Sequence, residues 1–226
     1  MAQRIIDFLG FGLCHQLPER TLMASGLQLP VCARDTGIYI GFMVAFFLIV
    51  ALGDGRRSSP PPMWLNIVLG LGLASMVFDG ATSYMGIRPT TNELRVATGL
   101  ATGFAIAAWV MPLLSGQVWM RSAPGRVLGD TRRALLYLLG MGGAYVLIWW
   151  VLPLTGPAYA LISVLAIVLT FTAINMVIVN LLPPFERRAT RLVETIPALG
   201  IALVLTFVEL WASAALKVWL IAAVPV

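Results

Sequence analysis

The residues best suited to chemistry lie ahead of the first long apolar segment of this 226-residue chain. Cys14 and His15 are adjacent, and Cys32 and Asp35 follow close together. The whole chain has two cysteines and one histidine, and this segment contains all three. Thiolate, imidazole and carboxylate groups are the protein ligands of zinc. The segment therefore predicts a site for zinc or another transition metal, with Cys14, His15, Cys32 and Asp35 as its candidate ligands.

Two other interpretations of these residues remain open. A disulfide between Cys14 and Cys32 is natural if the segment faces the outside of the cell, where thiols oxidise. Alternatively, two buried thiols and a hydrogen-bonded histidine are packing features without chemistry. The spacing matches no standard zinc motif, and the adjacent Cys14 and His15 bind one ion together only with difficulty. If one of the two does not bind, the metal keeps the open position that a catalytic zinc needs.

A second polar segment, Asp79–Arg95, connects two apolar segments. Its arginines carry planar guanidinium groups, which bind carboxylate and phosphate oxygens in pairs. The helix that follows offers free backbone N–H groups and the positive end of its dipole. These features predict a site for an anionic head group, whose candidate residues are Arg34, Arg88, Asn92 and Arg95.

The same segment also has a structural interpretation. Arg88 can pair with Asp79, and Arg95 can pair with Glu93 or with a lipid phosphate. Thr90 and Glu93 have the spacing of a capping box, in which two side chains bond to the free N–H groups of a helix start. In this interpretation the arginines hold loops and lipids in place and bind no substrate.

Three carboxylates are candidates for proton transfer, namely Asp79, Glu19 and Glu209. Glu209 lies inside the last apolar segment, where an ionisable group is costly and usually functional. Its alternative role is a protonated carboxyl group that bonds to a neighbouring helix. Asn175 and Asn180, in the preceding apolar segment, are expected to form hydrogen bonds between helices.

The composition indicates an integral membrane protein. Hydrophobic residues make up 59% of the chain and charged residues 11%, whereas a soluble domain has about 25% charged residues. The mean hydropathy is +0.90. The net charge of +5 points to the membrane surface, because the chain has no basic soluble module that would bind nucleic acid. The expected partners are membrane lipids, other membrane subunits or a second copy of the chain.

Apolar segments of about 20 residues predict membrane-spanning helices. Six occur between proline and glycine clusters that end helices, at Gly37–Leu52, Trp64–Phe78, Val96–Leu114, Leu135–Leu152, Ala158–Leu182 and Ile196–Ala223. Ile5–Leu13 is too short to span and is interpreted as an interfacial helix, and we expect no cleaved signal peptide. The sequence thus predicts an all-α, polytopic membrane fold. It forms a single membrane domain over residues 1–226, with an N-terminal Cys/His segment (1–36) ahead of a six-helix bundle (37–226).

The arginine positions predict the orientation of the chain in the cell membrane. The loops after the first, third and fifth spans carry nine arginines, and the other side carries five. Basic loops stay in the cytoplasm. The N-terminal Cys/His segment and the Asp79–Arg95 segment are therefore expected on the extracytoplasmic face.

These motifs resemble a family of small prokaryotic membrane proteins, domain-of-unknown-function family 2085. The similarity covers roughly the first hundred residues. The first family motif corresponds to Cys14-His15-Gln16, Pro18-Glu19-Arg20-Thr21 and Pro30-Val31-Cys32-Ala33-Arg34-Asp35-Thr36-Gly37-Ile38-Tyr39, and the second to Asp79-Gly80, Gly86, Arg88, Thr91, Asn92 and Arg95. The family usually has a third cysteine where this chain has Asp35. The three cysteines and one histidine of a Cys₃His zinc site are thereby replaced by two cysteines, one histidine and one carboxylate, and a carboxylate is a chemically harder ligand than a thiolate.

Three functions fit these features. The first is a metal-dependent enzyme on a lipid or prenyl substrate with an anionic head group, in which the metal activates water or polarises an oxygen. The second is a non-catalytic structural or assembly subunit of a larger membrane complex. The third is a transporter or channel, which Glu209 and the short second span favour and the lack of an internal repeat disfavours. The resemblance supplies no activity that decides between them.

Overall fold

The computed structural model describes residues 10–223, and its long elements are all helices. They are α2 (Ala33–Ala51), α3 (Met63–Tyr84), α4 (Asn92–Val118), α5 (Thr131–Val146), α6 (Pro157–Val179) and α7 (Ile196–Ala223). Within the described range, six helical segments are long and apolar enough to span a membrane; the fourth continues from α5 to Thr155 and the sixth begins at Leu192. The predicted all-α, polytopic membrane fold is confirmed. The expected interfacial helix at Ile5–Leu13 falls largely outside the described residues.

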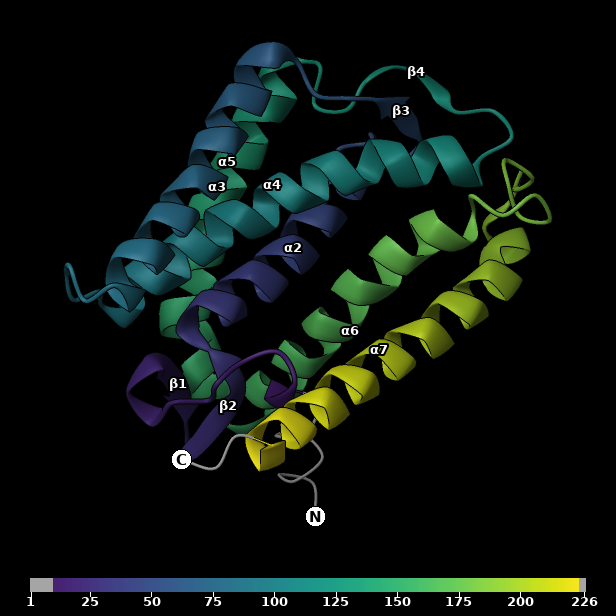
Figure 1. Ribbon diagram of the computed structural model, residues 1–226. Coiled ribbons are helices and arrows are strands. Elements are labelled where there is room, and N and C mark those ends of the chain that lie inside the picture. The colour runs from purple at the N-terminus through teal and green to yellow at the C-terminus, as the bar shows by residue number, and fades with distance from the viewer. Residues whose placement is uncertain (1–9, 224–226) are drawn as a thin grey trace.

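The centre of the bundle is the pair α2 and α4, whose backbones touch (Figure 1). A Cβ atom added at Gly99 would lie 2.1 Å from the carbonyl oxygen of Arg34, and one at Gly103 would lie 2.2 Å from that of Ile38. Only glycine permits so close an approach. The residues that follow Cys32 on α2 are thereby held directly against the first turns of α4.

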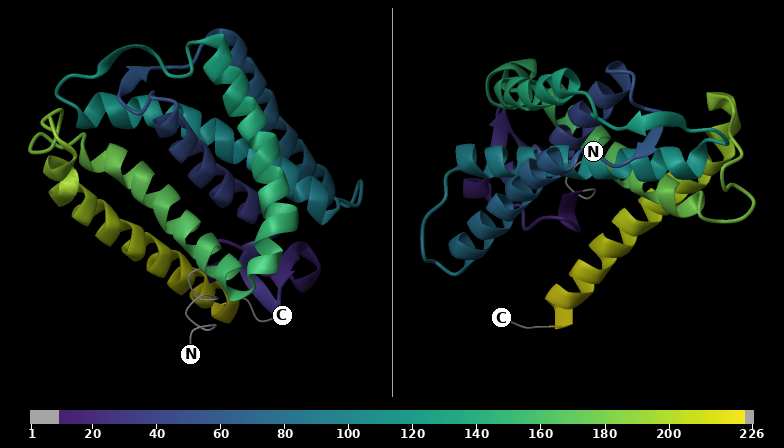
Figure 2. Two further views of the ribbon diagram at one scale, coloured as in Figure 1. Left: turned by 180° about the vertical axis from the view of Figure 1, so that it is seen from behind. Right: turned by 90° about the horizontal axis from the view of Figure 1, so that it is seen from above.

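The remaining helices flank this pair on two sides. Helix α3 packs against α4 and α5 against α2, while α6 contacts both central helices and carries α7 on its outer side. In Figures 1 and 2 the first half of α7 lies beside α6, and its C-terminal part leads away from α6 in the view from above. Of two glycines on α3, Gly72 faces Ala101 of α4, whereas a Cβ atom at Gly70 would meet nothing within 4 Å.

Short strands, which the sequence analysis did not predict, lie at both ends of the bundle. Ahead of α2, the turn η1 (Pro18–Arg20) leads into β1 (Thr21–Ala24), which pairs antiparallel with β2 (Leu27–Cys32). The connecting residues Ser25 and Gly26 both have positive φ angles, 50° and 77°, as a two-residue hairpin turn requires. At the opposite end, β3 (Arg57–Ser59) pairs parallel with β4 (Ala123–Arg126). The hairpin folds the N-terminal segment back over the start of α2.

Several predicted helix limits need correction, and two of them lie around the second polar segment. Elsewhere, the first and fourth helices begin four residues earlier than expected, at Ala33 and Thr131, and α4 ends at Val118 and not at Leu114. The second span was expected to end at Phe78 but continues to Tyr84, and the third starts at Asn92 and not at Val96. The helices continue because their polar side chains are satisfied inside the protein, as the network of Asp79 below shows. The N-cap is Thr91, whose hydroxyl accepts from the N–H of Leu94 at 3.4 Å.

Candidate metal and anion site

The ends of two elements bring three of the four candidate metal ligands together. Cys32 ends β2 and caps α2, and Asp35 lies in the first turn of α2. The folded-back segment places Cys14 beside them. The two Sγ atoms and one carboxylate oxygen of Asp35 all lie within 4.8 Å of one another. The backbone N–H of Cys32 donates to Cys14 Sγ and its thiol donates to Asp35 Oδ2, both at 3.3 Å.

His15, the fourth candidate ligand, lies outside this group, and the structure does not show the disulfide that was an alternative interpretation. His15 is exposed and is not part of the group of three ligand atoms. It does line a small cavity next to the two cysteines, which arginines also line. Neither Cys14 nor Cys32 is in a disulfide in the structure.

The last helix holds the Cys14 segment in place. Lys217 of α7 donates to the carbonyl oxygens of Cys14 at 2.6 Å and Phe11 at 2.8 Å, and Ser213 donates to that of Gly12 at 2.9 Å. Because these carbonyl groups have their partners on α7, the position of Cys14 depends on the packing of both ends of the chain.

The two thiols hold their protons with very different strength. A hydrogen bond from Cys32 lowers the pKa of the Cys14 thiol to about 5, and backbone N–H groups of Gln16 and Cys32 act in the same direction. The contact with Cys14 raises the pKa of Cys32, together with burial and the negative charge of Asp35. Cys14 is therefore a thiolate at neutral pH, and the thiolate is the form that binds metals.

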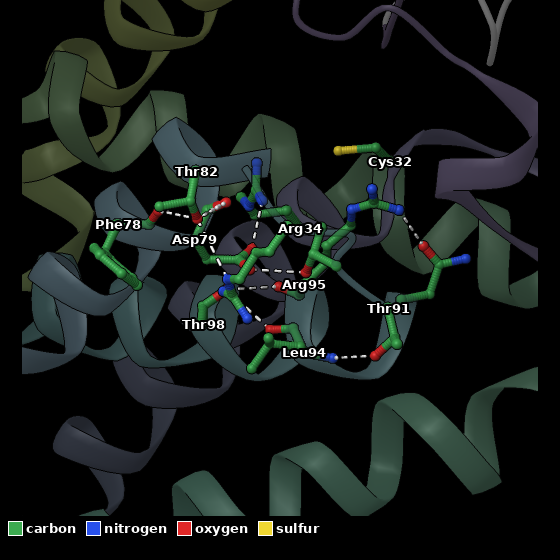
Figure 3. A network of polar contacts seen from close by, with 12 residues as sticks. Cys32, Arg34, Phe78, Asp79, Thr82, Thr91, Leu94, Arg95 and Thr98 are labelled. Carbon is green, nitrogen blue, oxygen red and sulfur yellow. Dashed lines mark hydrogen bonds and ion pairs between the residues drawn. The ribbon is translucent and has the colours of Figure 1, made fainter. Parts of the chain in front are cut away.

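A cavity of about 30 Å³ adjoins the cysteines, and arginines surround it. Its lining includes Cys14, His15, Arg20, Cys32, Arg34 and Arg95. Arg95 is only 8% exposed, and its guanidinium donates to Asn92 Oδ1 at 2.9 Å. Figure 3 shows the Arg95 side chain extending towards Cys32. The Nε of Arg34 is buried and has no hydrogen-bond partner among the described residues. The cavity is thus small, positively charged and next to a thiolate.

Asp79 lies at the centre of a network that connects α2, α3 and the start of α4 (Figure 3). Its carboxylate is 1% exposed and pairs with Arg34 at 2.5 Å and with Arg88 at 2.7 Å. Thr90 also donates to it at 2.7 Å. Arg88 therefore pairs with Asp79, as the structural interpretation of this segment predicted. The Thr90 hydroxyl is bonded to Asp79, and the residue that caps α4 is Thr91. Both carboxylate oxygens are fully engaged.

The other predicted residues lie around this network or far from it. Asn92 accepts from Arg95 and donates to the carbonyl oxygen of Glu19 at 3.2 Å. The Glu19 side chain is 66% exposed and does not line the cavity. Glu209 is exposed on α7 and accepts from Asn175 at 2.9 Å. Thus Arg34 and Arg95 face the cavity, Arg88 is paired with Asp79, and Asn92 orients Arg95.

Sequence reasoning missed two residues of these polar clusters. Arg20 lines the cavity and lies over the Tyr84 ring at 5.6 Å; its place in the first motif was the available signal. Asp54, at the opposite end of the bundle, is fully buried between Arg57, at 3.2 Å, and Arg133. The available signal for Asp54 was its position as the one acidic residue in the basic loop that contains Arg56 and Arg57.

The fold and the polar cluster define a multi-pass helical membrane protein with thiol, carboxylate and guanidinium groups gathered at one end of its helices. The chain belongs to the family of predicted membrane proteins called DUF2085, whose profile matches residues 14–109. The matched region begins at Cys14, contains the whole Asp79 network and ends inside α4. The predicted family resemblance is confirmed.

Two archaeal proteins described as uncharacterised are similar to the chain. One, from Methanocaldococcus jannaschii, is 31% identical over 109 residues, which are 48% of this chain and 68% of the relative. The other, from Methanothermobacter thermautotrophicus, is 38% identical over 96 residues, which are 42% of this chain and 81% of the relative. No solved structure matches the chain significantly.

Proposed function

We propose that the protein binds a transition metal, with zinc as the best fit, through Cys14, Cys32 and Asp35, and that it acts on an anionic lipid or prenyl substrate held beside the metal. The observation that carries the proposal is the approach of the three ligand atoms to within 4.8 Å of one another, next to a cavity of about 30 Å³. A catalytic zinc has three protein ligands and one open position. The cavity has room for one water-sized group at that position.

The arginines supply the second part of the proposed site. A phosphate or carboxylate oxygen in the cavity would meet Arg20, Arg34 and Arg95, and guanidinium groups bind such oxygens with charge-assisted hydrogen bonds. The metal would then polarise a substrate oxygen or activate a water. His15, on the rim, is the group placed to accept a proton or to complete the coordination.

Asp79 has a supporting role in this proposal. Because both of its oxygens accept from arginine or threonine, it is not free to exchange a proton with a substrate. It holds Arg34 towards the cavity. In the same proposal the site lies at the extracytoplasmic face of the cell membrane, which the larger number of arginines in the loops of the other side supports.

The test is elemental analysis of the purified protein in detergent, with Cys32→Ser and Asp35→Asn as variants. Asp130→Asn is the matched control, because Asp130 lies at the opposite end, ahead of α5, and its side chain makes no capping bond. We expect about one metal per chain in the wild type and control, and loss of metal in both site variants. A wild type without metal, whose two thiols titrate freely, would refute the metal site.

The anion part of the site needs a separate variant. Arg95→Gln should keep the metal and lose binding of a short-chain prenyl phosphate. If Arg95→Gln binds this probe as the wild type does, the arginines do not form the anion site.

A specific observation supports the alternative of a structural or assembly subunit. Glu209 lies near the middle of α7, is exposed, and has only the amide of Asn175 as a hydrogen-bond partner among the described residues. A carboxylate facing lipid at mid-span is costly, so a polar partner covering it would stabilise the protein. Native gel electrophoresis of gently solubilised membranes tests this. Glu209→Leu should convert a large complex to the free chain, and the lipid-facing control Val204→Leu should not; a wild type that migrates as a free chain refutes this alternative.

A further inference from the structure

A cavity of about 510 Å³ lies at the end of the bundle opposite to the cysteines, where α2, α4 and α6 meet the helical turn η4 (Leu192–Thr195) that leads into α7. In Figure 1 this is the end of α4 and α6 near β4. Its wall is mainly apolar and includes Phe46, Val50, Met111, Leu114, Val118 and Met176. The volume lies within the range of about 300–1,000 Å³ that is typical of small-molecule sites. An apolar group is the natural occupant, because it gains about 25 cal/mol for each Å² removed from water.

A second cavity, of about 270 Å³, adjoins the apolar one. Arg56 and Trp119 line both, and Arg121 and Thr190 line the second cavity. The guanidinium of Arg56 lies over the Trp119 ring at 4.1 Å, a contact that fixes its position. The two cavities therefore meet at Arg56 and Trp119, and they form an apolar part and a basic part of one candidate site.

The basic part carries charge that the protein does not neutralise. Within residues 10–223, neither Arg56 nor Arg121 forms an ion pair with an acidic side chain. The adjacent Arg57, in contrast, pairs with Asp54. The residues that line the two cavities include no aspartate or glutamate. The nearby carboxylate of Glu194 accepts hydrogen bonds from the N–H and hydroxyl of Thr190, so the lining itself favours an anion over the ammonium group of a zwitterionic head group.

We propose that these two cavities bind one anionic phospholipid from the surrounding membrane. An acyl chain occupies the apolar cavity, and the phosphate lies between Arg56 and Arg121. Guanidinium groups bind phosphate oxygens in a planar, paired geometry, and basic pockets between membrane helices are typical sites for anionic head groups. This site lies at the other end of the helices from the metal and anion site, and the proposal does not depend on that site.

Binding of lysophosphatidylglycerol to delipidated protein in a neutral detergent, measured by native mass spectrometry, tests the proposal. The comparison probes are lysophosphatidylcholine, which has the same chain and no net charge, and inorganic phosphate alone. We expect clear preference for the anionic lipid. Arg56→Gln should weaken its binding by about tenfold or more, since a hydrogen bond to a charged group contributes about 1.5–3 kcal/mol. Arg132→Gln is the control, because Arg132 is exposed near the same end and lines neither cavity.

A second pair of variants tests the apolar cavity without changing charge. Val50→Trp places a large side chain in the cavity wall at a position that is 49% exposed, where it fits without disrupting the core. It should abolish lipid binding, whereas Phe47→Trp, on the same helix and outside this cavity, should not.

Three results would overturn the proposal. Equal binding of the two lipids would mean that the arginines do not select an anion. Binding of inorganic phosphate as strong as that of the lipid would mean a simple anion site without a chain. Unchanged lipid binding in both Arg56→Gln and Val50→Trp would place the lipid elsewhere on the protein.

Discussion

Replacing Asp79 with asparagine should destabilise the protein much more than replacing its partner Arg88 with glutamine. The Asp79 carboxylate is 1% exposed and accepts from Arg34, Arg88 and Thr90. Asparagine has a similar shape, but it removes the negative charge. It also brings an amide N–H₂ group against guanidinium groups that can only donate.

The exposure of the two arginines sets the expected magnitudes. The Arg34 side chain is 13% exposed, and Asp79→Asn leaves this cation almost buried without a counter-charge, which costs about 3–5 kcal/mol. The Arg88 side chain is 39% exposed, so its pair with Asp79 contributes about 0–1 kcal/mol after screening by solvent. We therefore expect a loss in free energy of unfolding of about 3 kcal/mol for Asp79→Asn and at most about 1 kcal/mol for Arg88→Gln.

Unfolding by dodecyl sulfate in mixed micelles, followed by circular dichroism, measures both losses. The double variant Asp79→Asn/Arg34→Gln should lose less than the sum of the two single variants, because it removes the unpaired cation as well. A loss for Asp79→Asn that is no larger than that for Arg88→Gln would refute the structural reasoning. A stable Asp79→Asn protein that has lost activity on the proposed lipid or prenyl substrate would instead support the predicted role of Asp79 in proton transfer.

Three further predictions follow from the packing and the charges. In metal-free protein, the rate of alkylation of Cys14 should stay nearly constant as the pH falls to about 5. The alkylation rate of a thiol with an ordinary pKa would instead fall about tenfold per pH unit below about pH 8. Peptide mass spectrometry distinguishes the alkylated Cys14 peptide from the Cys32 peptide. Gly103→Ala should cost about 1–3 kcal/mol of stability, because its Cβ atom would lie 2.2 Å from a carbonyl oxygen of α2, whereas Gly70→Ala, with nothing within 4 Å, should be neutral or stabilising in the same unfolding assay. Asp54→Asn should cost about 3 kcal/mol, since Asp54 is fully buried between two arginines; a loss below about 1 kcal/mol would contradict this.

The number and type of the long helices could be read from the sequence, because a span needs only sufficient apolar length. Their limits near the second polar segment could not. Hydropathy counts each polar residue as unfavourable in a span, and it does not register that Asp79 pairs with Arg34 and Arg88. The helices α3 and α4 therefore extend further into the polar segment than predicted.

The sequence predicted the types of residue in the candidate site, and it predicted only partly which residues the site contains. Cys14, Cys32 and Asp35 come together as their chemistry indicated, while the metal itself stays a prediction. His15 is exposed and outside the group of three ligand atoms, whereas Arg20, which was not predicted, also lines the cavity. The hairpin β1–β2 decides which side chains face the cavity, and its register depends on pairing between strands that are too short to be recognised by periodicity.

The sequence by itself determined the membrane class, the family and the chemical groups available, because these follow from composition and local motifs. The tertiary structure decided which groups meet. Glycines on α4 bring its first turns against α2, so Arg34 reaches Asp79 and Arg95 reaches the cavity beside Cys32. Such contacts depend on the close approach of two helix backbones, a property that no single segment of the chain possesses.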